Sequence, residues 1–130
     1  MIAIDTNVVV RFLTRDDPAQ ATRAKSLIET RSIFLPKTVM LETEWVLRTR
    51  YRFERAAIAG GLTKLLGLPG VEAEDAATVA QALELHSLGF DFADGLHLAS
   101  SRRAEGFATF DRALQGKSSV AAEVVAVVAP

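Results

Sequence analysis

Short apolar runs alternate with longer amphipathic stretches along this chain, and the alternation predicts strands separated by helices. The runs that read as strands are Ile2–Ile4, Ile33–Leu35, Val71–Ala73, Phe107–Phe110 and Val124–Val128. Strands that alternate with helices favour a parallel sheet covered on both faces. We therefore predict an α/β fold of three layers, α/β/α, around a central, mainly parallel five-stranded sheet.

Helical periodicity fills the segments between these runs. The predicted helices cover Val8–Leu13, Pro18–Thr30, Pro36–Tyr51, Glu54–Leu66, Glu74–Leu88 and Asp91–Ala104. Pro18 suits the first turn of its helix, and Gly89 suits the position just after a helix end. Gly60 and Gly61 fall inside one predicted helix, where they indicate either a kink or a close contact between helices.

Composition narrows the range of possible functions. The chain has 130 residues, 49% of them hydrophobic and 24% charged, which predicts a single domain over residues 1–130. The net charge of −1 means that a polyanionic partner would need a local basic patch. The absence of cysteine excludes disulfides and thiolate ligands, and two histidines argue against a histidine zinc site. With no basic leader and no apolar span, we expect a cytoplasmic protein without a membrane partner.

The most informative acid is Asp5, which directly follows the first apolar run. In α/β sheets, ligands bind outside the carboxyl ends of the strands, so an acid there is placed for chemistry. Asp5 would equally well cap a helix that begins at Thr6. The local sequence leaves both interpretations open.

Glu42 lies in a predicted helix whose apolar arc contains Trp45 and Val46. At about 100° per residue, Glu42 is about 60° from Trp45 and about 40° from Val46, inside that arc. A carboxylate near a buried face is costly unless it meets a cation or takes up a proton. Glu44 has Arg48 four residues later, and we assign it to the surface. The alternative for Glu42 is a partly exposed position at the rim.

Three further acids sit where strands end or helices begin. Asp91 and Asp94 are spaced as a helix cap and its third residue, and Asp111 directly follows the fourth apolar run. Capping explains each acid by itself. Gathered at one sheet edge, however, carboxylates would repel one another, and a hard divalent cation such as Mg²⁺ would relieve that repulsion. Such a site suits phosphoryl chemistry.

Four segments in this order, IDTN, VMLETEWVL, FADGLHLAS and TFDRAL, resemble the PIN-domain ribonucleases over nearly the whole chain, in particular the VapC-type toxins of bacterial toxin–antitoxin pairs. The resemblance implies a metal-dependent endoribonuclease that uses Mg²⁺ or Mn²⁺. The residues that match the family's catalytic and metal-binding acids are Asp5, Glu42, Asp94 and Asp111. The residues that match its supporting positions are Thr6, Asn7, Asp91 and Thr109.

The resemblance also implies partners. Such a toxin cuts RNA, forms a homodimer, and is held by a small VapB-like antitoxin whose C-terminal segment covers the active site. Apolar surface on the helices between Pro36 and Leu66 is the groove we expect the antitoxin to use. The preferred candidates for contacts to RNA phosphates are Arg11, Lys37 and Arg112, within a wider set of Arg15, Arg48, Arg50, Arg52, Arg55, Arg102 and Arg103.

Two positions depart from the resemblance. Gly95 stands where similar proteins carry small or aliphatic residues, so we expect a looser helix start there. His97 is three residues from Asp94 and could approach a substrate, although a structural role is commoner. We expect His86 to be structural.

Two other functions compete with the nuclease. The first is an aspartyl-phosphate phosphotransfer domain, but Asn7 stands where a dehalogenase-type phosphatase needs a second aspartate. The second is a non-catalytic PIN-like module that acts only through a protein partner. Retention of all four acids argues against it, and binding of Mn²⁺ would distinguish the two.

Overall fold

Strands and helices alternate from one end of the chain to the other in the computed structural model, which describes residues 1–130. The contacts divide the chain into two compact units, Met1–Ala76 and Ala77–Pro130. All strand pairs are parallel, three strands forming a sheet in the first unit and two in the second. This confirms the predicted α/β fold with parallel strands. The five strands pair as a sheet of three and a sheet of two, where one five-stranded sheet was predicted. The single domain over residues 1–130 stays a prediction.

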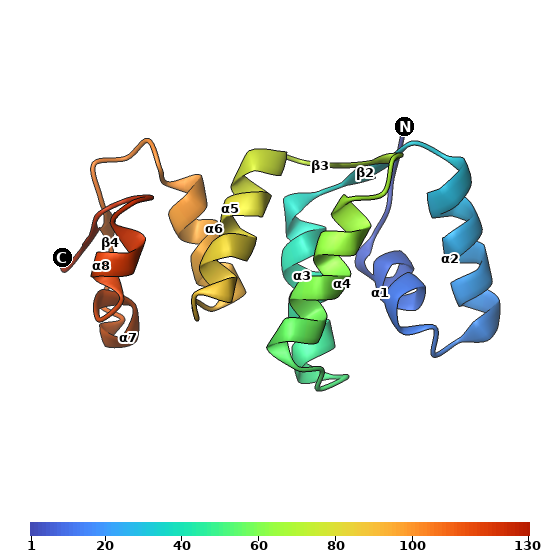
Figure 1. The fold of residues 1–130 in the computed structure, drawn as a ribbon, viewed down its shortest axis with the longest axis horizontal. Helices are drawn as coiled ribbons and strands as arrows, with labels where there is room; N and C mark the ends of the chain where they lie inside the picture. Colours follow the sequence, from blue (N-terminus) through green and yellow to red (C-terminus); the bar gives the residue numbers. More distant parts are fainter. The chain divides into compact units, whose positions relative to one another are not determined.

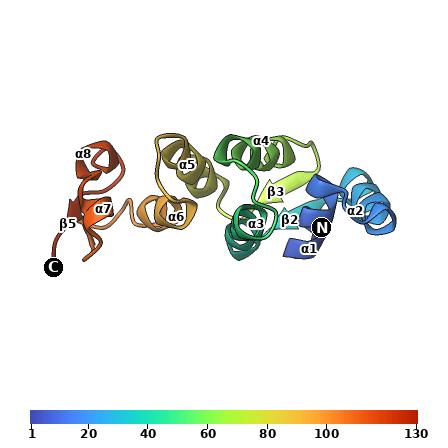
Figure 2. The ribbon, with the colours of Figure 1, turned by 90° about the horizontal axis from the view of Figure 1, so that it is seen from below.

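The first unit is a three-stranded sheet with four helices. Its elements are β1 (Ile2–Ala3), α1 (Thr6–Thr14), α2 (Pro18–Thr30), β2 (Ile33–Leu35), α3 (Lys37–Thr49), α4 (Arg55–Leu66) and β3 (Val71–Ala73). The strand order is β1-β2-β3, with Ile33 of β2 in register with Ile2 and Val71. Helix α1 packs against α2 and α3, and α4 packs against α3 and β3 (Figures 1 and 2). Strands β1 and β2 thus each lead into a helix of the same unit.

Local sequence explains where the first two helices begin. The side chain of Asp17 accepts a hydrogen bond from the Gln20 backbone, and Pro18 occupies the first turn of α2. Ile33 and Leu35, which point to the same face of the central strand, are fully buried, and Phe34 on the other face is half-buried. The sequence therefore places α2 and β2 at the predicted residues.

The second unit is smaller and holds the remaining elements. These are α5 (Ala76–Ser87), α6 (Phe92–Ser100), β4 (Phe107–Ala108), α7 (Arg112–Gln115), α8 (Ser118–Ala121) and β5 (Val127–Val128). Strand β4 pairs with β5, Phe107 opposite Val127. Leu85, Phe90, Leu98, Leu114, Ala121 and Val125 form its core. Helix α6 and the exit of β4 therefore share one core.

Several predicted boundaries are wrong at the C-terminal end. Helix α6 ends at Ser100 and not Ala104, because the backbone N–H of Ser101 bonds to Leu98 in a tighter turn. Helices α7 and α8 were not predicted. Strand β5 is shorter than Val124–Val128, because the backbone N–H groups of Val124 and Val125 bond back to Ala121 and extend the preceding turn.

Helix α4 is continuous through Gly60 and Gly61, so the predicted kink is absent. A Cβ added at Gly60 would meet nothing within 4 Å, and one at Gly61 would make an ordinary contact of 3.7 Å with Leu13. Neither glycine is therefore needed for a close approach of helices. No helix has both the length and the apolar character needed to cross a membrane.

Candidate active site

Asp5 lies directly after β1 and caps α1. Its exposed side chain accepts hydrogen bonds through Oδ1 from the backbone N–H groups of Asn7 at 3.1 Å and Val8 at 3.3 Å. The capping interpretation is thus correct. Because both hydrogen bonds use Oδ1, the second carboxylate oxygen can still bind a cation. Capping and metal binding are compatible at this residue.

Glu42 of α3 is held beside the start of α1. The hydroxyl of Thr6, which is only 6% exposed, donates a hydrogen bond to Oε1 of Glu42. Thr6 directly follows Asp5, so this bond ties the Glu42 carboxylate to the residue next to Asp5. The structure thereby brings together three of the predicted site residues of the first unit.

The predicted buried face of α3 is wrong. Glu42 is exposed and Trp45 is 47% exposed, while the buried positions of α3 are Met40, Thr43, Glu44 and Leu47. Glu44, predicted at the surface, is only 3% exposed, and its Oε2 lies 2.8 Å from Nε of Arg48. The i,i+4 pair that suggested a solvated position instead neutralises a buried carboxylate. Compared with the prediction, α3 is rotated about its axis, so that the polar residues Thr43 and Glu44 face the interior of the protein.

In the second unit, Asp91 caps α6 and Asp94 lies in its first turn. The side chain of Asp91 accepts a hydrogen bond from the backbone N–H of Asp94 at 3.3 Å. Gly95 is buried, and a Cβ there would lie 2.9 Å from the carbonyl oxygen of Ala82 in α5. The expected looser helix start is therefore wrong, since Gly95 permits close packing of α6 on α5.

Asp111 follows β4 and caps the short helix α7. Its Oδ1 accepts hydrogen bonds from the backbone N–H groups of Ala113 at 2.9 Å and Leu114 at 3.1 Å. The backbone N–H of Asp111 donates to the hydroxyl of Thr109 at 3.0 Å. The Thr109 hydroxyl thus fixes the backbone of the acid, and its supporting role in the site stays a prediction.

The surroundings of Asp94 change its pKa. Partial burial raises the pKa of Asp94 above its ordinary value, and the negative charges of Asp91 and Asp111 raise it further. The basic side chains of His97 and Lys117 act in the opposite direction on the pKa of Asp94. Sequence reasoning did not identify Lys117, since nothing in the local pattern relates it to Asp94.

The donor chemistry of these side chains fits a hard divalent cation. All of the predicted ligands are carboxylates, and a partly buried carboxylate crowded by two others is stabilised by added positive charge. Within either unit, no three acidic or histidine side chains converge tightly enough to enclose a metal ion by themselves. The residues predicted to hold a metal are Asp5, Glu42, Asp94 and Asp111, with Asp91 as a supporting residue.

The three preferred RNA-contact residues have different surroundings. Arg11 donates hydrogen bonds to Gln20 at 2.8 Å and to the Tyr51 hydroxyl at 3.0 Å, so it also holds helices together. Nζ of Lys37 lies 3.5 Å from a carboxylate oxygen of Asp75. Arg112 is exposed at the start of α7, beside Asp111.

Both histidines have aromatic neighbours. His97 is exposed and stacks on Phe107, with ring centroids 6.1 Å apart and an interplanar angle of 13°. His86 is buried and meets the Phe92 ring edge-on. The structural role expected for His86 agrees with its burial.

A cavity of about 440 Å³ opens between α1 and α2. Asn7 lies at this cavity, together with Arg11 and Arg23 and the apolar Val8 and Leu27. Asp5 is not among the residues that line it. A second cavity, of about 550 Å³, lies between α1 and α4.

Comparison with known proteins adds one finding to this geometry. A family model described as PIN domain matches residues 2–118, which is most of the chain and includes all of the acids discussed above. Comparison with curated proteins gave no match.

Proposed function

The chain belongs to the PIN-domain family, whose members have a nuclease-type fold and typically bind divalent metals, and from this we propose that it is an endoribonuclease of VapC type. It hydrolyses RNA phosphodiester bonds with Mg²⁺ or Mn²⁺ as cofactor, as the toxin of a toxin–antitoxin pair. The observation that carries the proposal is the PIN-domain match over residues 2–118, which includes Asp5, Glu42, Asp94 and Asp111. Carboxylates are the ligands that hard divalent cations prefer, which supports a metal-dependent nuclease.

The proposed ligands are Asp5, Glu42, Asp94 and Asp111. What supports their joint role is the order and spacing of the four segments within the matched family. A bound divalent cation would neutralise the phosphodiester, lower the pKa of a water molecule and stabilise the leaving oxyanion.

The other residues orient these carboxylates and the substrate. Thr6 fixes the Glu42 carboxylate through its hydroxyl, and Thr109 fixes the backbone of Asp111. One carboxylate of the site accepts the proton of the attacking water at a carboxylate oxygen. Arg112, exposed beside Asp111, is placed to contact an RNA phosphate.

The test is cleavage of a pool of structured RNAs by purified protein with Mg²⁺, with Mn²⁺ and with chelator. We expect cleavage that needs metal and is lost in Asp5→Asn and Asp94→Asn. Asp17→Asn is the matched control, because Asp17 also caps a helix and Asn caps as well as Asp. RNA that stays intact under all conditions, in a protein that still binds a partner, would instead indicate a non-catalytic binding module.

We also propose that a small VapB-like antitoxin binds the cleft between α1 and α4. The apolar side chains of Phe12, Leu13 and Leu65 line this cleft together with the cations Arg15 and Lys64. These walls suit an amphipathic segment that carries acidic residues. The cleft includes α4, one of the two helices expected to form the groove.

The partner is tested by adding the purified product of a small neighbouring gene to the cleavage reaction. Inhibition that is weakened by Leu13→Asp and Lys64→Glu would support the cleft. Equal inhibition of these variants and the wild type would place the partner elsewhere. Sedimentation of the free protein tests the proposed homodimer.

A further inference from the structure

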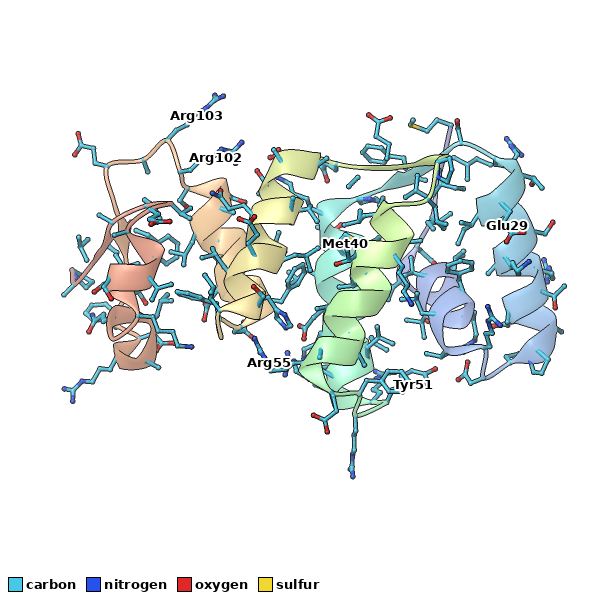
Figure 3. The ribbon with its side chains drawn as sticks, viewed as in Figure 1. Glu29, Met40, Tyr51, Arg55, Arg102 and Arg103 are labelled. Carbon is cyan, nitrogen blue, oxygen red and sulfur yellow. The ribbon has the colours of Figure 1, made fainter.

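The segment that joins α3 to α4 concentrates positive charge in a chain whose net charge is −1. Four of the 15 lysine and arginine residues of the chain lie between positions 48 and 55, at Arg48, Arg50, Arg52 and Arg55. Aromatic residues alternate with them. We call residues 50–54 the α3–α4 connection; Figure 3 labels Tyr51 within it and Arg55 at the start of α4. This is the kind of local basic patch that a polyanion requires.

The aromatic pair of this connection is rigid and partly exposed. The rings of Tyr51 and Phe53 stack with centroids 5.7 Å apart and an interplanar angle of 21°, and Phe53 is 43% exposed. The Tyr51 hydroxyl donates a hydrogen bond to Asp16 at 2.6 Å and accepts one from Arg11 at 3.0 Å. The inner ring is therefore fixed, and an aromatic surface that is already ordered loses little entropy on binding.

The cations beside this pair remain at the surface. Arg50 and Arg52 are both exposed, and the guanidinium carbon of Arg50 lies 5.9 Å from the centroid of the Trp45 ring. Glu54 is the one acid between positions 45 and 55. The connection therefore presents the positive charges of Arg50 and Arg52 next to the exposed ring of Phe53.

We propose that the α3–α4 connection is a docking platform for single-stranded RNA, in which a base stacks on Phe53 and phosphates contact Arg50 and Arg52. The inference rests on the proposed function in one respect, namely that the substrate is RNA. A ring that can stack with any base, beside alternating cations, is the chemistry by which proteins hold single strands without reading sequence. A partner protein with an acidic surface would use the cations but would gain little from the stacked ring.

The experiment measures binding of a fluorescently labelled, unstructured RNA oligonucleotide by anisotropy, in chelator and at several salt concentrations. We expect the double variant Arg50→Ala, Arg52→Ala to bind the RNA more weakly. Its plot of log affinity against log salt concentration should also be less steep by about 1.4, because each lost phosphate contact removes about 0.7 from the magnitude of the slope. Phe53→Leu should weaken binding about 5-fold or more at an unchanged slope, because it removes stacking and keeps the charge.

A charge-matched control separates this site from diffuse attraction. Arg23→Ala with Arg31→Ala removes two exposed arginines outside the connection and outside the candidate RNA contacts, and should leave affinity nearly unchanged. Thermal unfolding checks that every variant is folded. Equal weakening by both arginine pairs, or unchanged binding in Phe53→Leu, would overturn the platform.

Two further outcomes separate this proposal from the proposed function. Loss of dimer formation or of partner binding in the connection variants, with RNA affinity unchanged, would show a protein interface instead and overturn the proposal. Metal-dependent cleavage by a protein whose RNA affinity does not depend on the connection would refute the platform alone. RNA binding through the connection without any cleavage would refute the nuclease function and leave the platform standing.

Discussion

Two helical glycines provide a direct test of the packing that positions Asp94. A Cβ at Gly95 in α6 would lie 2.9 Å from the backbone carbonyl oxygen of Ala82, whereas a Cβ at Gly60 in α4 would meet nothing within 4 Å. Replacing Gly by Ala in a helix gains up to about 1 kcal/mol from backbone entropy in both cases. At position 95, but not at position 60, the added methyl group must displace the neighbouring backbone, which lowers the free energy of unfolding by about 1–3 kcal/mol.

We therefore expect Gly60→Ala to be more stable than wild type by about 1 kcal/mol. Gly95→Ala should be less stable than Gly60→Ala by about 1–3 kcal/mol, the steric cost that the two variants do not share. For a chain of this size that gap is at least about 3 °C in unfolding temperature. Urea and thermal unfolding of the three proteins, without metal, measure it.

The same contact has a functional consequence, because α6 also carries Asp91 and Asp94. A shifted α6 would move these acids, so Gly95→Ala should also lessen the stabilisation that Mn²⁺ gives. Gly60→Ala is the matched control and should retain it. If Gly95→Ala were as stable as Gly60→Ala and retained its response to Mn²⁺, the close packing of α6 on α5 would be refuted.

Three further changes test electrostatics and positioning. Because burial and neighbouring carboxylates raise the pKa of Asp94, its ionised form destabilises the protein above that pKa, and the cost fades as pH falls through it. Asp94→Asn should therefore unfold at a higher temperature than wild type at pH 7 without metal, and should gain less stability from Mn²⁺. A hydrogen bond from Tyr51, and to a lesser extent one from Thr14, lowers the pKa of Asp16 in the folded protein. The ionised Asp16 therefore stabilises the folded protein at pH values above its unfolded-state pKa, and this stabilisation is lost as the pH falls through its folded-state pKa. Tyr51→Phe should reduce this acid-linked loss, measured as the difference in unfolding temperature between neutral and acid pH. Thr6→Val frees the Glu42 carboxylate and should raise the Mn²⁺ concentration needed for half-maximal activity about 10-fold or more, with recovery in Thr6→Ser.

Matched variants control these measurements. Asp17→Asn removes a capping charge elsewhere and should leave unfolding unchanged, whereas a stability loss in Asp94→Asn would refute the repulsion among the acids. An acid profile for Tyr51→Phe identical to wild type would contradict the role of its hydroxyl. Thr22→Val, also in a helix, should not change the Mn²⁺ dependence, and an unchanged dependence in Thr6→Val would exclude its positioning role.

Local signals in the sequence predicted much of the secondary structure. Helix α2 and strands β2 and β3 have the predicted bounds, because Pro18 and Asp17 define a helix start and short apolar runs between turns define strands. The acids at helix starts were also predictable, since Asp5, Asp91 and Asp111 have the side chains that cap helices. The short helices near the C-terminus escaped prediction, because four residues are too few for a periodic pattern.

The sequence by itself determined most of the elements, the resemblance to the PIN-domain family and the identity of the candidate acids, because caps, turns and motif spacing act over a few residues. Only the tertiary structure decided which face of α3 is buried. Thr43 and Glu44 are buried although both are polar, and the buried carboxylate of Glu44 is neutralised by its ion pair with Arg48. Only the tertiary structure also brought Thr6 to Glu42, and Asp111 close enough to raise the pKa of Asp94. These contacts join residues far apart in the chain, and packing between elements, not local preference, determines them.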